Sequence, residues 1–195
     1  MISVILLAAG ASRRMGKQDK LALAYQGQSM LEHTIRQLRA SAITELIVVR
    51  PSASKAFLPT DLSDQVTIAV NPNPDRGMTS SILAGLPLLH PETNGVMIAL
   101  ADMPLLLTAD YNRIIGAFRE AVAQEPGTIA VPFFEGRKGN PVIFSTFFLD
   151  ALKHNPHPEG ARLIIKAEWD SLCRVEMDTK AILLDVDTPD DYRAL

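Results

Sequence analysis

Residues 6–20, LLAAGASRRMGKQDK, have the types and spacing that phosphate binding requires. Gly and Ala leave the backbone bare enough to approach a phosphate chain, and guanidinium and ammonium groups neutralise its negative charge. Backbone amides of residues 11–16 would add an anion-binding nest. The segment therefore predicts a site for a nucleoside triphosphate. Its cationic side chains are those of Arg13, Arg14, Lys17 and Lys20.

Two common nucleotide-binding loops are excluded by spacing. Gly10 and Gly16 are too far apart for the dinucleotide pattern G-x-G-x-x-G, and Lys17 is not followed by the Ser or Thr of a Walker A loop. What remains is a longer basic loop. On spacing alone, a solvated basic turn stays an alternative.

Acidic residues follow two apolar runs further along the chain. Asp102 comes directly after VMIAL-A and before Met103-Pro104, which places a carboxylate where a strand ends in a turn. Such a group can hold Mg²⁺ against triphosphate oxygens, although an isolated Asp in this context is also typical of a plain turn. In the second cluster, LLDVDTPDDY, we expect Asp190 and Asp191 to lie in the first turn of a helix and interact with its dipole.

Apolar periodicity predicts the elements that position these residues. Ser29 and Glu32 form a capping-box pattern before one helix, Thr79, Ser80 or Ser81 could cap a second, and Thr108 is expected to cap a third that runs to about Gln124. Shorter helices are expected near Phe147–Lys153, near Pro158–Glu168 and over residues 187–195. The expected strands are Ser3–Ala8, Ile43–Val49, Val66–Val70, Val96–Leu100, Thr128–Pro132, Val142–Phe144 and Ile182–Val186.

Alternating strands and helices without an internal repeat predict an α/β protein of one domain, residues 1–195, with an open, mostly parallel sheet covered by helices on both faces. In such sheets ligands bind beyond the carboxyl ends of the strands. The loops after the first, third and fourth strands should therefore meet at a single edge.

Composition narrows the function classes. The 195 residues carry a net charge of −3, so no overall positive field favours nucleic acid. The single Cys173 excludes an internal disulfide and fits a cytoplasmic protein. The first apolar run, ISVILLAA, is far shorter than a membrane span and is interpreted as a buried strand. The four histidines have no spacing typical of a metal site or a catalytic triad.

Four motifs in order resemble those of the MobA-like nucleotidyltransferases that build molybdenum cofactors. The first loop is similar to A-(A/G)-G-x-S-x-R-M-G-x-x-K, and D-M-P, G-N-P-V and D-V-D-T-P follow along the chain. This resemblance implies a three-layer α/β/α Rossmann-like nucleotidyltransferase fold with a mostly parallel mixed sheet. It also implies a reaction in which a nucleoside triphosphate and a phosphorylated acceptor give a diphosphate-linked product and pyrophosphate.

The resemblance also implies roles for single residues. Arg14, Lys20 and Asp102 would be catalytic, with Lys17 an alternative to Lys20. Mg²⁺ would be held by Asp102 and Asp187, with Asp185 an alternative to Asp187. Arg76 is an additional candidate for a phosphate contact, and Arg137 and Lys138 beside G-N-P-V for the acceptor's terminal phosphate. The expected nucleotide-binding residues are Leu7, Ala8, Ala9, Gly10, Ser12, Arg13, Arg14, Lys20, Asn71, Gly77, Met78, Ser81 and Asp102.

The expected nucleotide base and the expected acceptor come from smaller similarities to branches of this family. Ala8-Ala9-Gly10 resembles the cytidylyl branch and favours CTP, whereas the spacing from Met15 to Lys20 is closer to the guanylyl branch. Molybdopterin is the expected acceptor, and a molybdenum hydroxylase would receive the product. Alternatives are an NAD(P)H- or flavin-dependent oxidoreductase, a binding protein that delivers the cofactor without catalysis, and a transferase acting on another small phosphorylated acceptor.

Overall fold

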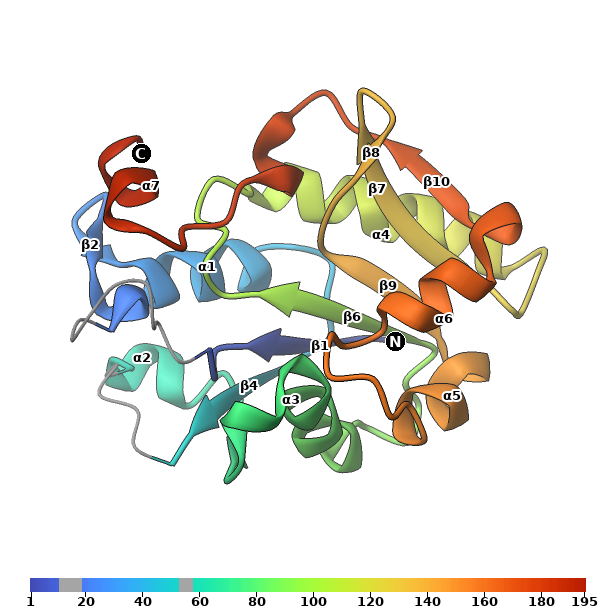
Figure 1. Ribbon diagram of the computed structural model, residues 1–195, viewed down its shortest axis with the longest axis horizontal. Helices are drawn as coiled ribbons and strands as arrows, with labels where there is room; N and C mark the ends of the chain where they lie inside the picture. Colours follow the sequence, from blue (N-terminus) through green and yellow to red (C-terminus); the bar gives the residue numbers. More distant parts are fainter. Residues whose placement is uncertain (11–18, 53–57) are drawn as a thin grey trace.

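The computed structural model describes residues 1–10, 19–52 and 58–195 of the protein (Figure 1). Among these residues, eight strands form one sheet in the order β10-β7-β9-β6-β1-β4-β5, with β8 paired to β7. The strands are β1 (Ile2–Leu7), β4 (Glu45–Pro51), β5 (Thr67–Asn71), β6 (Gly95–Leu100), β7 (Ile129–Phe134), β8 (Arg137–Lys138), β9 (Val142–Ser145) and β10 (Cys173–Glu176). A separate small hairpin joins β2 (Ala24–Tyr25) to β3 (Gln28–Ser29).

The predicted sheet, mixed but mostly parallel, is confirmed. β1 lies between β4 and β6 and is parallel to both, with Ile5 opposite Ile47 on one side and Ile98 on the other. Only β9 reverses direction between β6 and β7, so the carboxyl ends of β1, β5 and β6 share an edge. The central strands are buried on both faces, which explains their continuous apolar runs.

Helices cover both faces of the sheet (Figure 1). One apolar layer contains residues of α1 (Met30–Arg39) and α4 (Thr108–Val122), the other residues of α3 (Met78–Gly85), α5 (Leu149–Lys153) and α6 (Arg162–Ala167). The remaining helices are α2 (Thr60–Ser63) and α7 (Pro189–Arg193). The described helices include none that is both long and apolar enough to cross a membrane.

The start of α1 confirms the predicted capping box. The Ser29 hydroxyl accepts a hydrogen bond from the Glu32 amide, and the Glu32 carboxylate accepts one from the Ser29 amide. Two other predicted caps are wrong. The N-cap of α3 is Gly77, two residues before the earliest expected cap, Thr79. Thr108 is the first residue of α4, where its hydroxyl donates to the backbone carbonyl of Gln37.

The predicted strand Ile182–Val186 is also wrong. Thr179 caps a short 3-10 turn at Lys180–Leu183, and the amide of Val186 then donates to the carbonyl of Asp102 instead of joining a ladder. The strand in this region is β10, which was not predicted because its four residues alternate between buried and exposed and include two charged side chains. The β2–β3 hairpin was also missed, although its turn residues Gln26 and Gly27 both have positive φ, as a tight hairpin turn requires.

Candidate active site

A cavity of about 500 Å³ lies at the carboxyl ends of β1, β5 and β6. Its volume falls within the range of small-molecule sites. Strand ends supply Leu7 and Leu100, and the first turn of α3 supplies Met78. The full lining is Leu7, Ala9, Gly10, Lys20, Leu21, Pro74, Asp75, Gly77, Met78, Ser81, Leu100, Asp102, Asp185 and Asp187.

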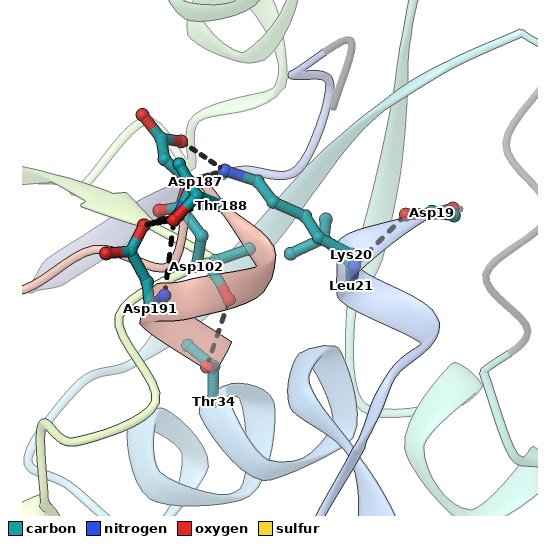
Figure 2. A network of polar contacts seen from close by, with 9 residues as sticks. Asp19, Lys20, Leu21, Thr34, Asp102, Asp187, Thr188 and Asp191 are labelled. Carbon is teal, nitrogen blue, oxygen red and sulfur yellow. Dashed lines mark hydrogen bonds and ion pairs between the residues drawn. The ribbon is translucent and has the colours of Figure 1, made fainter. Parts of the chain in front are cut away.

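Lys20 joins two carboxylates at this cavity (Figure 2). Its Nζ donates to Asp102 Oδ2 at 2.5 Å and to Asp187 Oδ1 at 2.8 Å. The side chain comes from a short 3-10 turn, Lys20–Ala22, whose N-cap Asp19 accepts a hydrogen bond from the Leu21 amide. Lys20 is only 6% exposed, so its charge is compensated by these acids and not by water.

Burial and charge act in opposite directions on this pair. Burial by itself would lower the pKa of Lys20, but the nearby carboxylates of Asp102 and Asp187 outweigh it, and the pKa lies above its ordinary value. Burial also raises the pKa of Asp102, and the Lys20 ammonium opposes that rise. Lys20 is therefore a firmly protonated cation at neutral pH.

The acidic groups fit a divalent cation. Asp102, Asp185 and Asp187 each offer a carboxylate oxygen within 4.8 Å of the others. The second oxygen of Asp102, Oδ1, is buried and accepts no hydrogen bond from any described residue, which would be costly unless another partner binds it. Among the described residues, these three carboxylates are paired with one ammonium, which Lys20 places on Asp102 and Asp187, so a cation with oxygen preference suits both the charge and the donor set.

Hydrogen bonds to two backbone carbonyls fix the segment around Asp102. The Thr34 hydroxyl on α1 donates to the carbonyl of Ala101 at 3.3 Å, and the amide of Val186 donates to the carbonyl of Asp102 at 2.8 Å. The second bond ties the loop after β6 to the residue preceding Asp187. Two acids 85 positions apart in the sequence are thereby held at one place by the main chain.

Most of the nucleotide-binding residues predicted from the sequence line the cavity, but not all. Ala8 is buried, and its amide donates to the carbonyl of Val49. Asn71, 1% exposed, donates to the hydroxyls of Ser80 and Ser81 and therefore orders the start of α3 from outside the cavity lining. Ser12, Arg13, Arg14 and Lys17 lie outside the described residues.

The lining also includes residues that sequence reasoning did not assign to the site. Leu21 follows Lys20, Pro74 and Asp75 precede Gly77, and Leu100 ends β6. Each is a close neighbour of a motif residue, and that adjacency was the only signal available. Arg76, named as a phosphate contact, is exposed and is not in the lining.

Gly77 has a steric reason to be glycine. Its φ is +87°, and a Cβ added there would lie 2.4 Å from the carbonyl oxygen of Pro158. The Thr79 hydroxyl donates to the carbonyl of His157, so the loop before α6 packs directly on the first turn of α3. This close approach fixes the wall of the cavity that Met78 lines.

The G-N-P-V segment packs beside the second acidic loop. The Asn140 amide donates to the carbonyl of Ile182 at 2.9 Å, and a Cβ on Gly139 would lie 2.3 Å from that same oxygen. Arg137 and Lys138 are exposed on β8 and do not line the cavity. Although the Lys138 side chain is largely open to solvent, the protein atoms around its ammonium displace part of its hydration, and this loss of water together with the nearby Arg162 lowers the pKa of Lys138.

A sheet edge that gathers a buried lysine and three carboxylates beside a cavity of about 500 Å³ has the charge and the size that a nucleotidyltransferase site needs. A comparison of the sequence with protein families supports this class. The MobA-like NTP transferase domain matches residues 4–172, and the chain belongs to this family. The match ends before Asp185 and Asp187, which the structure places close to Asp102.

Three relatives show what the chain resembles. It is 26% identical to nicotine blue oxidoreductase from Paenarthrobacter nicotinovorans over all of this chain and 96% of the relative. It is 28% identical to molybdenum cofactor cytidylyltransferase from Escherichia coli K12 over 98% of this chain and 93% of that protein. The solved structure of Rv0371c from Mycobacterium tuberculosis H37Rv superposes with a TM-score of 0.80 at 28% identity, covering 99% of this chain and 95% of that one. A second structure of that protein is a complex with manganese (TM-score 0.77, 27% identity, 100% and 97% coverage).

Proposed function

We propose that the protein transfers CMP from CTP to the phosphate of molybdopterin and releases pyrophosphate. The observation that carries this proposal is the buried Lys20 paired with Asp102 and Asp187 at the cavity. Similarity to the molybdenum cofactor cytidylyltransferase over nearly the whole chain supports the substrates, and Ala8-Ala9-Gly10 supports CTP over GTP.

The reaction needs no protein nucleophile. An oxygen of the acceptor phosphate attacks the α-phosphorus of CTP in line, a new P–O bond forms, and the bond to the pyrophosphate oxygen breaks. Catalysis then depends on positioning and on neutralising the charge of the leaving group. In the proposal, Lys20 supplies an ammonium for the phosphate oxygens, and Arg14 supplies a second cation. The apolar lining from Leu7, Leu21 and Leu100 excludes water from one side of the reacting groups.

Mg²⁺ fits the acidic side of the cavity. Asp102 and Asp187 would hold it, with Asp185 close enough to take part. When bound, the ion would neutralise charge on the phosphate oxygens of nucleotide and acceptor. A metal ion at this place is favoured by the residues themselves, because Asp102 Oδ1 has no described hydrogen-bond donor. In the proposal the reaction takes place in the cytoplasm, and a molybdenum hydroxylase receives the product.

Pyrophosphate release tests the proposal. The purified protein is given CTP, GTP or ATP, each with and without Mg²⁺ and with and without molybdenum-loaded molybdopterin. We expect release with CTP only when both metal and acceptor are present. Release with GTP instead would move the protein to the guanylyl branch, and tight binding of CTP and acceptor without release would identify a delivery protein.

An oxidoreductase is a second candidate function, since similarity to nicotine blue oxidoreductase extends over the whole chain. Against it, the first loop lacks the dinucleotide pattern G-x-G-x-x-G. A decrease in NADH or NADPH absorbance with a quinonoid dye as acceptor, together with no pyrophosphate release, would favour this alternative.

A further inference from the structure

We propose that the C-terminal helix α7 is a clamp that holds Asp187 and the Lys20 segment in their positions, with Asp191 and Tyr192 as positioning residues. The inference rests on the proposed function for its catalytic consequence. Its structural basis is independent of that function, because it consists of hydrogen bonds from one short helix to two separate parts of the site (Figure 2 shows the Asp191 side).

Asp191 holds the backbone of Asp187. A single oxygen, Asp191 Oδ2, accepts hydrogen bonds from the Asp187 amide at 3.1 Å, the Thr188 amide at 2.7 Å and the Thr188 hydroxyl at 2.8 Å. The Asp191 amide donates back to the Thr188 hydroxyl, which completes a capping box. By holding the Asp187 amide, the Asp191 carboxylate restrains the direction in which the Asp187 side chain projects from the main chain.

Tyr192 connects the same helix to the segment that carries Lys20. Its hydroxyl donates to the carbonyl of Ala24 at 2.6 Å, and Figure 1 shows α7 beside β2. One residue before Ala24, the Leu23 amide donates to the carbonyl of Lys20 at 3.2 Å. The bond from Tyr192 thus restrains the end of the 3-10 turn from which the lysine projects.

A third contact closes the arrangement. Because the Val186 amide donates to the carbonyl of Asp102, residues 186–192 touch the backbone around each of the three charged groups. Lys20 and Asp187 are 167 positions apart, so their contact distance depends on where this last segment docks. The clamp also lies beyond the residues that the family model matches.

The neighbouring Asp190 supplies a matched control. It lies in the same first turn of α7 and interacts equally with the helix dipole, but its carboxylate pairs with the exposed Arg193. A purely electrostatic role at the helix dipole would affect both aspartates alike. A positioning role affects Asp191 alone.

The experiment compares Asp191→Ala, Asp190→Ala and Tyr192→Phe with the unchanged protein. Mn²⁺ affinity is measured by the electron paramagnetic resonance signal of the free ion, and turnover by pyrophosphate release. Loss of a residue that orients a metal ligand typically costs 10- to 100-fold in affinity or activity.

We expect Asp191→Ala to weaken Mn²⁺ binding by about tenfold or more, and Asp190→Ala to leave it unchanged. Tyr192→Phe should lower kcat with a smaller effect on Mn²⁺ binding, and Asp191→Asn, which keeps an acceptor oxygen, should restore part of the affinity.

Equal Mn²⁺ affinities for Asp191→Ala and Asp190→Ala would overturn the clamp, as would an unchanged protein that binds no Mn²⁺. If the unchanged protein binds Mn²⁺ but releases no pyrophosphate with any nucleotide, the proposed function fails while the affinity comparison still decides the clamp. Far-UV circular dichroism separates either result from misfolding. If Asp191→Ala does not fold, Tyr192→Phe tests the clamp instead, because it removes only one hydroxyl from a partly exposed ring. Unchanged turnover in Tyr192→Phe would overturn the clamp.

Discussion

Among single residues, Lys20 determines how the candidate site is charged. It is buried, and two carboxylates bind its ammonium directly. Sequence spacing alone left Lys17 and Lys20 as alternatives, since both follow the same glycine-containing loop. The distinction depends on the turn at Lys20–Ala22, whose capping residue, Asp19, is also an ordinary surface residue type. The structure places Lys20 in the cavity, and Lys17 lies outside the described residues.

Replacing Lys20 should lower turnover by orders of magnitude and leave the fold intact. Lys20→Ala and Asp102→Ala are each expected to reduce kcat by about 100-fold or more, because loss of one preorganised charge typically costs that much. Lys153→Ala, which removes an exposed lysine on α5, is the control. Steady-state pyrophosphate release measures the effect, and circular dichroism checks folding. Full turnover in either site variant would contradict the assignment.

The raised pKa of Lys20 predicts a pH dependence of stability. Its folded-state pKa lies above the unfolded value of about 10.4, so the ion pairs stabilise the fold fully below that pH and the contribution is lost as pH rises through the folded pKa. The difference in unfolding free energy between the unchanged protein and Lys20→Met should therefore shrink above about pH 10. Urea unfolding in EDTA from pH 7 to 11 measures this difference. A difference that stays constant across the range would show that the pairs do not titrate as described.

At the scale of elements, apolar runs predicted four strands of the sheet. One of them, β5, is an edge strand on which Ile68 and Val70 are exposed. The other three, β1, β4 and β6, were predictable because strands buried on both faces carry continuous apolar residues. The last third of the chain was less predictable for the same reason. β10 is a short edge strand with one buried face, and the turn at Lys180–Leu183 is apolar because it packs on the core, so an apolar run there did not indicate a strand. Whether such a segment forms a strand or a turn depends on its pairing with residues far away in the sequence. The local sequence carries no information about that pairing.

The entry to α3 provides a test at this scale. Gly77→Ala should destabilise the fold by about 2–4 kcal/mol, since it combines a positive φ with a clash against the Pro158 backbone. Gly10→Ala is the matched control: Gly10 also lines the cavity, but no atom of the described residues lies within 4 Å of an added Cβ, so stability should change by less than about 0.5 kcal/mol. Chemical denaturation gives both values. Equal effects would mean that the close approach of residues 157–160 does not constrain α3.

At the scale of the whole molecule, the site exists because the sheet gathers residues that are far apart in sequence. The rule that ligands bind at the carboxyl ends of parallel strands predicted which loops would meet. Lys20 contacts partners 82 and 167 positions away, and the second of these contacts comes from a segment with no strand of its own. The sequence named Asp187 only through a family resemblance, since no local pattern shows where the last ten residues dock.

Metal binding should stabilise the whole fold if the three acids form one site. At a free Mn²⁺ concentration 100 times the dissociation constant, linkage contributes about 2.7 kcal/mol, and a chain of this length should gain roughly 5–10 °C in Tm. Differential scanning fluorimetry with and without Mn²⁺ measures the shift. Asp102→Ala should remove it, and Asp61→Ala, at an exposed pair with Arg36, should not. An equal shift in Asp102→Ala would place the metal elsewhere.

The location of a bound metal tests the central claim most directly. Crystals grown with CTP and Mn²⁺ can be measured at the manganese absorption edge, where anomalous difference density identifies the ion without reference to the protein's chemistry. The account predicts a peak between the carboxylates of Asp102 and Asp187, with the triphosphate alongside Lys20. A nucleotide bound in this cavity with manganese at another place, or with no manganese peak near these two acids, would contradict it.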